Sequence, residues 1–356
     1  MNQSRNTLRC WFFRQENALN IPKLSQKINE LFLEYKTENH PGVQLGIVHK
    51  GSLIFQHVQG LADMERNVEI SQNTLFDIAS IAKHFVAACI LMLEEEGKIN
   101  TEDGIGKYIS RAPQSYSQIR VSDLLSHTSG IKDYMDILEE SGLNESNAYK
   151  KNEILDMIFD CPLEAAPGTE YSYSNSNYFL LMLILEEIEK ISLAESARER
   201  IFLPLGMNST CFYDDHRKIL RDRALSYKRL DNGSFQNFPY IFDIVGDTGL
   251  LTNVQDLIKW DACFYSKNVQ LLSERILSKL NTKQTLRNGE EICYSFGLFI
   301  QEIAGYKAEC HWGEAAGYIS EMVRVPEIEL TVICLSNFLG AKYVAYEILE
   351  SIIGDL

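Results

Sequence analysis

The chain has 356 residues, of which 45% are hydrophobic and 23% are charged, and its formal net charge at pH 7 is -15. This length and apolar content are sufficient for one large globular domain or two closely packed ones. The negative charge and the lack of a Lys/Arg cluster argue against a nucleic-acid partner, and no apolar run reaches the roughly 18 residues of a membrane span.

Residues 1–20 are expected to form an N-terminal tail. They lack the apolar core of a secretory signal, because their longest apolar run is Cys10 to Phe13. The eight cysteines of the chain are scattered without metal-finger spacing, which favours reduced thiols and predicts no metal site. Both observations predict a cytoplasmic protein rather than a periplasmic or organellar one.

The N-terminal part of the chain predicts one helix and two strands. Apolar residues recur at helical spacing from about residue 24 to residue 35, and His40-Pro41-Gly42 then ends the pattern. Segments 43–48 and 53–58 are rich in strand-forming residues and are separated by a short turn. They predict an antiparallel hairpin.

The middle of the chain is predicted to be mostly helical. Apolar residues recur at helical spacing in segments 80–97, 121–126, 152–159, 177–190 and 194–202. After about residue 246 the pattern changes again. Strands are predicted at 294–303, 318–325 and 329–336, followed by a closing helix at 341–353.

Together these segments predict an α+β fold with an antiparallel sheet of about five strands flanked by helices. In this prediction both chain ends, residues 21–79 and 246–356, form one α/β lobe. Residues 80–245 form a second, mostly helical lobe, with a cleft between the two.

Ser80 and Lys83 form a Ser-x-x-Lys motif at the start of an apolar helical run. If Ser80 opens this helix, Lys83 lies one turn along the same face, so its amine can reach the serine hydroxyl. A buried lysine loses its proton more readily, and its free amine can activate a serine as a nucleophile. The motif alone is weak, because an N-cap serine and an exposed lysine give the same pattern. A second copy is present at Ser129 and Lys132, where Gly130 disfavours a helix that would align the pair.

Two later segments supply further candidate side chains. Tyr173-Ser174-Asn175 lies in a loop before an apolar helix, where alternate residues point the same way, so a phenol and an amide can face one cavity. Taken alone, this loop is more simply interpreted as a helix cap. His311-Trp312-Gly313 lies between strand-like segments. Gly313 leaves room for a substrate to approach the backbone, and His311 is titratable near neutrality, although an isolated histidine, as at His127, is more often structural.

In this order the segments resemble the motifs of the serine β-lactamase and penicillin-binding family. The similarity is greatest to the branch of class C β-lactamases, D-alanyl-D-alanine carboxypeptidases, D-aminopeptidases and related esterases, and it extends from about residue 24 to the end of the chain. The segments that carry it are Thr74 to Lys83, Leu124 to Ile131, Pro167 to Tyr178, Phe202 to Met207, Gly246 to Leu251 and His311 to Gly313.

The resemblance implies catalytic roles for three matching positions. Ser80 would be the acylated nucleophile, and Lys83 would be its proton acceptor or electrostatic partner. Tyr173 would be the general base that relays protons to the leaving group. The division of the base role between Lys83 and Tyr173 stays open.

The resemblance also implies a substrate-binding set without a cofactor. Asn175, His311 and Gly313 would bind substrate, and the backbone N–H groups of Ser80 and Glu314 would form an oxyanion hole.

Two positions depart from the best-known form of the family's third motif, Lys-Thr-Gly. Here His311 replaces a permanent cation with one that is only partly charged near neutrality, and Trp312 replaces a small hydroxyl residue. The expected function is therefore a serine hydrolase acting on a small ester, amide or peptide. A true class C-like β-lactamase or D-Ala-D-Ala carboxypeptidase is one alternative, and a non-catalytic binding or assembly protein is another. The sequence lacks the Gly-x-Ser-x-Gly of α/β-hydrolases and the His-x-x-x-His of zinc hydrolases, and it does not predict an oligomeric state.

Overall fold

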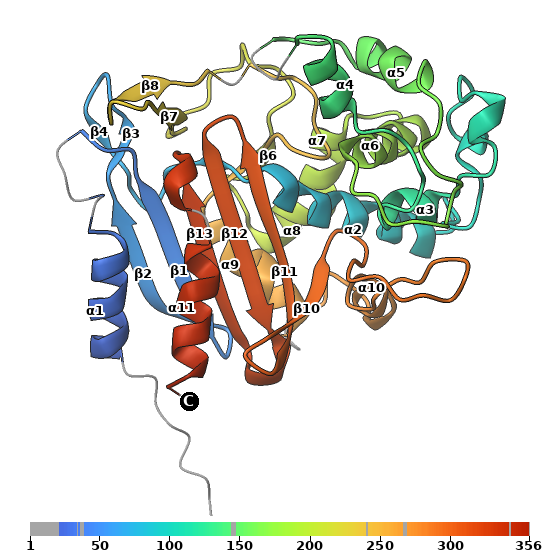
Figure 1. Cartoon of the computed structure of the whole chain (residues 1–356). Coiled ribbons are helices and arrows are strands. Elements are labelled where there is room, and N and C mark those ends of the chain that lie inside the picture. Colours follow the sequence, from blue (N-terminus) through green and yellow to red (C-terminus); the bar gives the residue numbers. More distant parts are fainter. Residues whose placement is uncertain are drawn as a thin grey trace, which may run out of the picture.

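A six-stranded antiparallel sheet forms the centre of the fold (Figure 1). The computed structural model describes residues 21–33, 35, 39–143, 147–239, 241–265, 269–341 and 343–355, so the predicted tail at residues 1–20 lies outside the described residues. In spatial order the strands are β10 (Phe299–Ile303), β11 (Tyr306–Ala315), β12 (Tyr318–Val325), β13 (Leu330–Ser336), β1 (Val43–His49) and β2 (Ser52–Gln59). Val43 of β1 pairs with Ser336 of β13, so distant parts of the chain meet in one sheet. The predicted α+β fold is confirmed.

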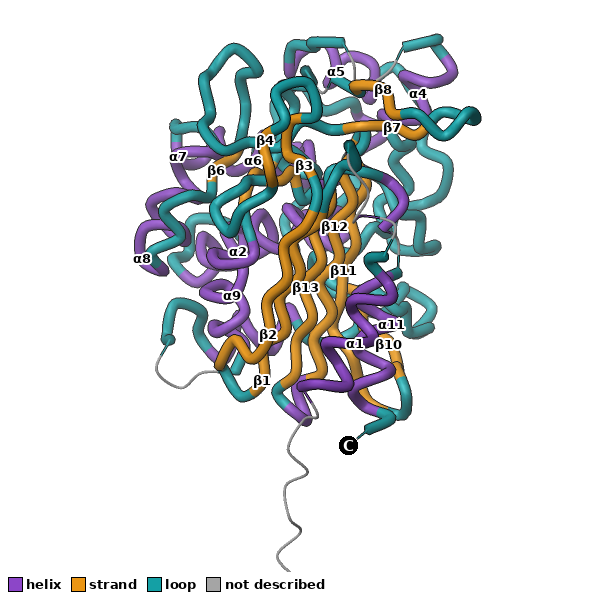
Figure 2. The backbone as a smooth tube through the Cα atoms, turned by 90° about the vertical axis from the view of Figure 1, so that its left-hand side faces the viewer, coloured by secondary structure: helices purple, strands orange, loops and turns teal. Residues whose placement is uncertain are grey.

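Two terminal helices cover one face of this sheet. α1 (Ile21–Leu31) and α11 (Val344–Ile353) lie side by side against it in Figures 1 and 2. Ile28 and Ile348 of these helices pack with strand residues at alternate positions, among them Val332 and Cys334. This packing follows from the pleat, because alternate side chains of a strand face opposite sides of a sheet.

The opposite face packs against α2 (Ala82–Glu95) and α9 (Val254–Asp261). Phe85 of α2 stacks on Trp260 of α9 with ring centroids 4.4 Å apart, and the same core contains Met322 of β12 and Leu335 of β13. α2 is buried around most of its circumference. This explains why its sequence is apolar on all sides rather than along one stripe.

The remaining helices extend the fold around α2 and away from the sheet (Figure 1). They are α3 (Val121–Leu125), α4 (Tyr134–Glu140), α5 (Lys151–Phe159), α6 (Asn175–Glu189), α7 (Leu193–Ala197), α8 (Leu203–Leu205) and α10 (Glu274–Leu280), with a π-helical turn at Arg198–Phe202. None of the helices in the described ranges has both the length and the apolar character needed to span a membrane.

Short strands form three smaller sheets. β3 (Leu61–Asp63) pairs with β4 (Val68–Glu69), and β7 (Tyr227–Arg229) pairs with β8 (Phe235–Asn237). The third sheet contains β5 (Phe76–Asp77), β9 (Leu250–Thr252) and β6 (Cys211–Phe212). β5 directly precedes Ser80, so this third sheet fixes the approach of the chain to the predicted nucleophile.

The sheet has six strands instead of the predicted five because the sequence pattern does not reveal β11. Only one face of β11 is apolar, with Ala308 and Cys310 in the core under the terminal helices. On the other face lie Glu309, His311 and Gly313. All three are buried, although Glu309 and His311 are polar and Gly313 has no side chain. Polar and small residues at inward positions hide the alternation that marks a strand. His311 therefore lies within a strand rather than between strands.

Four helices are also absent from the prediction, namely α4, α8, α9 and α10. All four are short, and α4 and α10 have seven residues each, so their periodicity extends over only two turns. The predicted strand at 294–303 begins only at Phe299. One hydrophobic core contains residues of both α2 and the sheet. The division of the chain into two lobes at residues 79/80 and 245/246 stays a prediction.

Candidate active site

Ser80 and Lys83 are hydrogen-bonded at the N-terminal end of α2. Ser80 lies in a 3-10 turn, Ala79–Ile81, that leads directly into the helix. The Lys83 ammonium nitrogen Nζ lies 2.9 Å from Ser80 Oγ and also donates to Asn175 Oδ1 at 2.8 Å and to the backbone oxygen of Asp247 at 3.0 Å. The three donor positions of the amine are thus directed at three fixed acceptors, one of which is the serine hydroxyl.

Burial tunes the acidity of Lys83. Its side chain is 0% exposed, and the loss of hydration lowers its pKa to about 8, while the nearby carboxylates of Asp247 and Asp133 oppose the shift. A lysine with this pKa is partly neutral near pH 7 and can accept a proton. The pair therefore has the geometry and the proton affinity of a nucleophile with its base.

The turn that carries Ser80 is held from two sides. Ala79 has a φ of 45°, a left-handed conformation that is uncommon for alanine, and its N–H donates to Asp77 Oδ1 at 2.7 Å. Burial raises the pKa of the Asp77 carboxyl to about 7. On the other side, a Cβ at Gly313 would lie 2.3 Å from the oxygen of Ile78 and 2.8 Å from the nitrogen of Ser80. The space that a side chain at residue 313 would need is thus filled by the protein's own backbone. The contact of Gly313 with substrate stays a prediction.

Tyr173 lies next to this pair as a neutral phenol. Lys83 Nζ is 4.9 Å from the centroid of its ring, and the ring stacks on His127 at 4.1 Å. Within the described part of the chain, the buried Tyr173 hydroxyl makes no hydrogen bond of normal length. Burial raises the pKa of Tyr173 well above 10, and the neighbouring Ser80 hydroxyl only partly opposes this. In this state Tyr173 can donate a proton, whereas Lys83 is the stronger candidate to accept one from Ser80.

Asn175, the first residue of α6, is oriented by Asp133. Its side-chain N–H and its backbone N–H both donate to Asp133 Oδ2, at 2.9 and 3.0 Å. The other oxygen of Asp133 caps α4 by accepting from the Met135 N–H at 2.9 Å. Sequence reasoning missed Asp133, although an aspartate directly before an apolar helical run is a recognisable N-cap signal.

His311 is neutral, contrary to the expectation of a partly charged side chain. It is 1% exposed, and burial together with the charge of Lys83 lowers its pKa to about 3. Nδ1 lies 2.6 Å from the backbone oxygen of Trp312, which can only accept, so Nδ1 carries the proton. Nε2 then accepts from the Tyr294 hydroxyl at 3.2 Å. His311 therefore replaces the lysine of the common third motif without replacing its charge.

A small cavity of about 50 Å³ opens beside Ser80. Its walls are formed by Ser80, Tyr134, Met135, Asn175, Phe242, Asp247, Thr248, Glu314 and Ala315. Glu314 pairs with Ile319 near the end of β11 and lines the cavity together with Ser80. This arrangement is compatible with the predicted oxyanion hole, which stays a prediction.

Comparison with known proteins agrees with the motifs. The family model described as Beta-lactamase matches residues 28–350. The chain belongs to the beta-lactamase family. Among its relatives, "Penicillin-binding protein 4*" of Bacillus subtilis (strain 168) is 29% identical over 313 residues, which cover 81% of this chain and 66% of that protein. A "D-aminopeptidase" of Brucella anthropi is 25% identical over 340 residues, which cover 94% of this chain and 64% of the relative.

Solved structures of this family have the same fold. The octameric penicillin-binding protein homologue from Pyrococcus abyssi has a TM-score of 0.81 and 28% identity, covering 94% of this chain and 78% of that one. The D-amino acid amidase from Ochrobactrum anthropi SV3, complexed with L-phenylalanine amide, has a TM-score of 0.78 and 21% identity, covering 94% and 98%. The chain spans about 64 to 66% of the length of the two curated relatives, so their activities are not transferred directly.

Within this beta-lactamase-family fold, the structure brings together Ser80, Lys83, Tyr173, Asn175 and the third-motif segment, as predicted. Asp247 and Tyr134 also line the cavity, and the sequence did not single them out as site residues. Asp247 lies in the segment Gly246 to Leu251, which carries part of the family resemblance. The resemblance gave this segment no role in binding or catalysis, so the contacts of Asp247 with the site were not expected.

His127 has a structural role that supports the site. Its φ of 58° shapes a turn, and its Nδ1 accepts from the Ser174 N–H and lies the same 3.1 Å from Asn177 Nδ2. Its ring forms the surface on which Tyr173 stacks. This agrees with the structural interpretation of His127.

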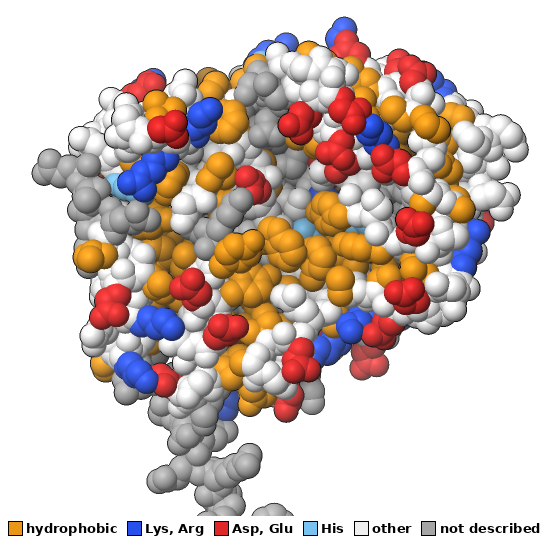
Figure 3. All heavy atoms as spheres, viewed as in Figure 1, with side chains coloured by type: hydrophobic (Ala, Val, Ile, Leu, Met, Phe, Trp, Pro, Cys, Tyr) orange, Lys and Arg blue, Asp and Glu red, His pale blue; other side chains and the backbone are white. Residues whose placement is uncertain are grey.

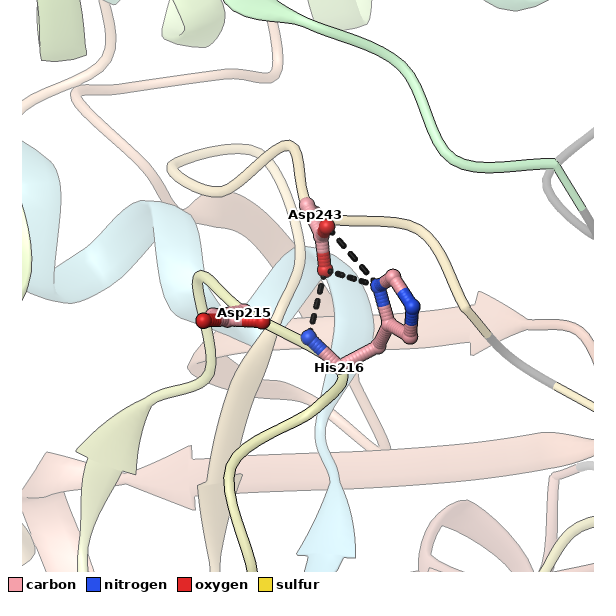
Figure 4. Close-up of side chains that lie close together, drawn as sticks. All are labelled: Asp215, His216 and Asp243. Atoms are coloured by element: carbon pink, nitrogen blue, oxygen red, sulfur yellow. Dashed lines mark hydrogen bonds and ion pairs between the residues drawn. The ribbon is translucent and has the colours of Figure 1, made fainter.

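A cluster outside the site has ligand atoms close enough to suggest a metal. Asp215, His216 and Asp243 place one such atom each within 4.8 Å of one another (Figure 4). However, Asp243 already accepts from the His216 backbone N–H at 2.6 Å and faces its Nδ1 at 2.8 Å, while Asp215 is paired with Arg217 at 2.7 Å. These contacts tie the loop of His216 to the segment before Asp247, and we assign no metal to the cluster.

Proposed function

We propose that the protein is a serine hydrolase that forms an acyl-enzyme on Ser80 and acts on small amides, peptides or esters. The observation that carries this proposal is the 2.9 Å contact between Ser80 Oγ and a fully buried lysine amine whose pKa is lowered to about 8. A serine hydroxyl becomes a nucleophile when a positioned base accepts its proton.

The proposed reaction has two steps. Neutral Lys83 takes the Ser80 proton as Oγ bonds to the substrate carbonyl carbon, and the leaving amine or alcohol departs with a proton supplied through Tyr173 or Lys83. A water molecule then attacks the Ser80 ester, giving a proton to the same base, and the carboxylic acid is released with Ser80 restored. The backbone N–H groups of Ser80 and Glu314, two residues of the cavity wall, would donate hydrogen bonds to the negative charge that develops on the carbonyl oxygen.

The charge of the site favours amides and esters over β-lactams and carboxypeptidase substrates. The latter carry a carboxylate near the scissile bond, and neutral His311 offers no positive charge to bind it. The names of related proteins, a D-aminopeptidase and a D-amino acid amidase, are consistent with this choice.

The test is labelling with a fluorescent fluorophosphonate, followed by hydrolysis assays on p-nitrophenyl esters, amino-acid p-nitroanilides and nitrocefin. We expect the wild type to be labelled and Ser80→Ala to lose the label. Ser129→Ala, which alters the second Ser-x-x-Lys segment, is the matched control and should still be labelled, because it leaves Ser80 and Lys83 in place. No label on the wild type would refute the proposal, and label without turnover of any substrate would favour a binding protein.

A further inference from the structure

The Asp247 carboxylate has one oxygen without a partner, although it is buried in the wall of the active-site cavity. Asp247 is 3% exposed, and its Oδ2 accepts from the Tyr134 hydroxyl at 2.6 Å. Lys83 donates to the backbone oxygen of Asp247 rather than to this carboxylate. In the described part of the chain, no other residue donates a hydrogen bond to Oδ1. A buried carboxylate oxygen without a donor is costly, so a ligand that brings one is favoured there.

The cavity that Asp247 lines is acidic. The described residues around it include the carboxylates of Asp247 and Glu314 but no lysine or arginine. Lys83 lies behind Ser80 with its donors already directed at Ser80, Asn175 and the Asp247 backbone.

The surface near the cavity has the same sign. Figure 3 shows Asp and Glu side chains gathered over α4 and α5, and Tyr134 and Met135 of α4 form part of the cavity wall. On α4 the exposed acids are Asp136, Glu139 and Glu140, of which Glu140 is paired with Lys132. A substrate that carries positive charge is attracted to such a surface, whereas an anion is repelled.

We propose that Asp247 binds the free ammonium group of the substrate, so that the preferred substrates are amides, peptides or esters of amino acids with an unblocked amine. This inference rests on the proposed hydrolase function and adds the recognition element to it. An ammonium group supplies three N–H donors and a positive charge, and the cavity of about 50 Å³ exceeds the roughly 10 to 15 Å³ that one water molecule requires on the same measure.

Binding of an ammonium at Asp247 also affects the proton of Lys83. The Asp247 carboxylate favours the charged form of Lys83, and a second cation would offset that influence. The titratable groups that face Asp247 are Lys83 of α2, Asp77 of β5, Asp133 and Tyr134 at the start of α4, and Tyr173 before α6. Because none of these other groups contributes a compensating positive charge, an amine-bearing substrate releases the Lys83 proton more readily than a neutral substrate does.

The test compares two substrates that differ only in the amine, alanine p-nitroanilide as each enantiomer and propionic acid p-nitroanilide. For the preferred enantiomer of the wild type we expect kcat/KM to exceed that of the propionyl compound by at least about tenfold, the value of one charge-assisted hydrogen bond. Asp247→Asn should reduce this ratio by at least about tenfold, mainly through KM. In the wild type, the acidic limb of the pH profile of kcat should lie at lower pH for the alanyl substrate than for the propionyl substrate. In Asp247→Asn, the two profiles should coincide.

Tyr134→Phe is the matched control, since it removes the hydrogen bond to Oδ2 but keeps the carboxyl group. Because this hydrogen bond opposes the rise of the Asp247 pKa to about 6, the variants are compared at pH 8, where Tyr134→Phe should retain the substrate ratio. Circular dichroism confirms that each variant is folded. A ratio near one in the wild type, or an equal loss for both substrates in Asp247→Asn, would overturn the proposal and leave Asp247 as a residue that positions Lys83.

A binding assay separates this inference from the proposed function. Alanine amide should slow fluorophosphonate labelling of Ser80 in the wild type more than propionamide does, and this readout needs no turnover. Labelling that both amides slow equally contradicts ammonium recognition but leaves the nucleophile assignment intact. Loss of labelling altogether contradicts the proposed function itself.

Discussion

Two segments of this chain have the same Ser-x-x-Lys spacing and very different surroundings. Ser80 and Lys83 lie in one continuous helical turn, where the amine is buried and hydrogen-bonded to the hydroxyl. In the second segment, Ser129 donates to Asn177 Oδ1 at 2.5 Å, and Lys132 forms an ion pair with Glu140 at 2.7 Å.

The acidity of the two lysines differs accordingly. Burial lowers the pKa of Lys83 to about 8, whereas the hydrogen bond to Glu140 raises the pKa of Lys132. The spacing alone therefore does not make a base. Two things distinguish the pairs. Lys83 is desolvated and Lys132 is not buried, and the backbone from Ser80 to Lys83 is helical, whereas the φ of 74° at Gly130 prevents a helix between Ser129 and Lys132.

The second segment nevertheless serves the site. Ser129 holds Asn177, the backbone oxygen of Lys132 accepts from the Ser176 hydroxyl at 2.6 Å, and Asp133 holds Asn175. These contacts fix the first turn of α6, which presents Asn175 to Lys83. One copy of the motif supplies the chemistry and the other supports a partner residue.

The largest expected difference between the segments is kinetic. Lys83→Met should lower kcat/KM by about 10²-fold to 10⁴-fold, because it removes the base for Ser80. Lys132→Met should change kcat/KM by less than about threefold, since it removes only an ion pair near the surface. Steady-state assays on an amino-acid p-nitroanilide measure both values. Similar losses in the two variants would mean that burial of Lys83 is not what distinguishes the pairs.

A smaller effect is expected from pH. If neutral Lys83 accepts the Ser80 proton, kcat/KM for an uncharged ester should increase roughly tenfold between pH 7 and pH 9 and then level off, following its pKa of about 8. His311, whose pKa is lowered to about 3, should contribute no fall between pH 5 and pH 8. Rates measured in buffers of constant ionic strength test this, and a profile that is flat from pH 6 to pH 9 would exclude Lys83 as the base.

The smallest expected effect is on stability. Folding lowers the pKa of Lys83 from the ordinary 10.5 to about 8. Between about pH 8 and pH 10.5 the unfolded state therefore binds more protons than the folded state. The stability of the wild type increases as the pH rises through that window. At pH 7 the buried charge is a cost, and Lys83→Met should raise the free energy of unfolding by roughly 1 to 3 kcal/mol. Lys132→Met should change it by less than about 0.5 kcal/mol.

Urea unfolding at pH 7 and pH 9 measures these differences, and the gain from Lys83→Met should shrink at the higher pH. A clear loss of stability in Lys83→Met would show instead that the three hydrogen bonds of the amine outweigh its desolvation.

The comparison also explains which features the sequence can reveal. Ser80, Lys83, Tyr173 and Asn175 belong to short motifs next to clear helical periodicity, so the residues and their approximate placement were predictable. Asp133 and Asp247 reach the site through contacts with residues 42 and 164 positions away, which no local pattern contains. The charge of His311 was predicted wrongly because its pKa depends on burial.

The strand β11 illustrates a similar limit. Its inward Glu309 is buried in the core, where its carboxylate lies 3.4 Å from the guanidinium of Arg324 of β12. Arg324 also forms an ion pair with Asp261 of α9 at 2.8 Å. A buried charge is tolerable when such partners exist, but the partners are distant in sequence. The polar inward face of β11 was therefore not readable as part of a strand.

The pairing of β1 with β13 has a consequence for biosynthesis. The helix that carries Ser80 is made before β13, and β1 acquires this neighbour only after the ribosome has added the last strand of the sheet. The paired residues Val43 and Ser336 are 336 − 43 = 293 positions apart. Long-range pairing of this kind slows folding, and until it forms β1 has an open edge. A chain that lacks β13 should therefore be inactive and prone to association, so that Ser80 becomes reactive only after β13 has been synthesised.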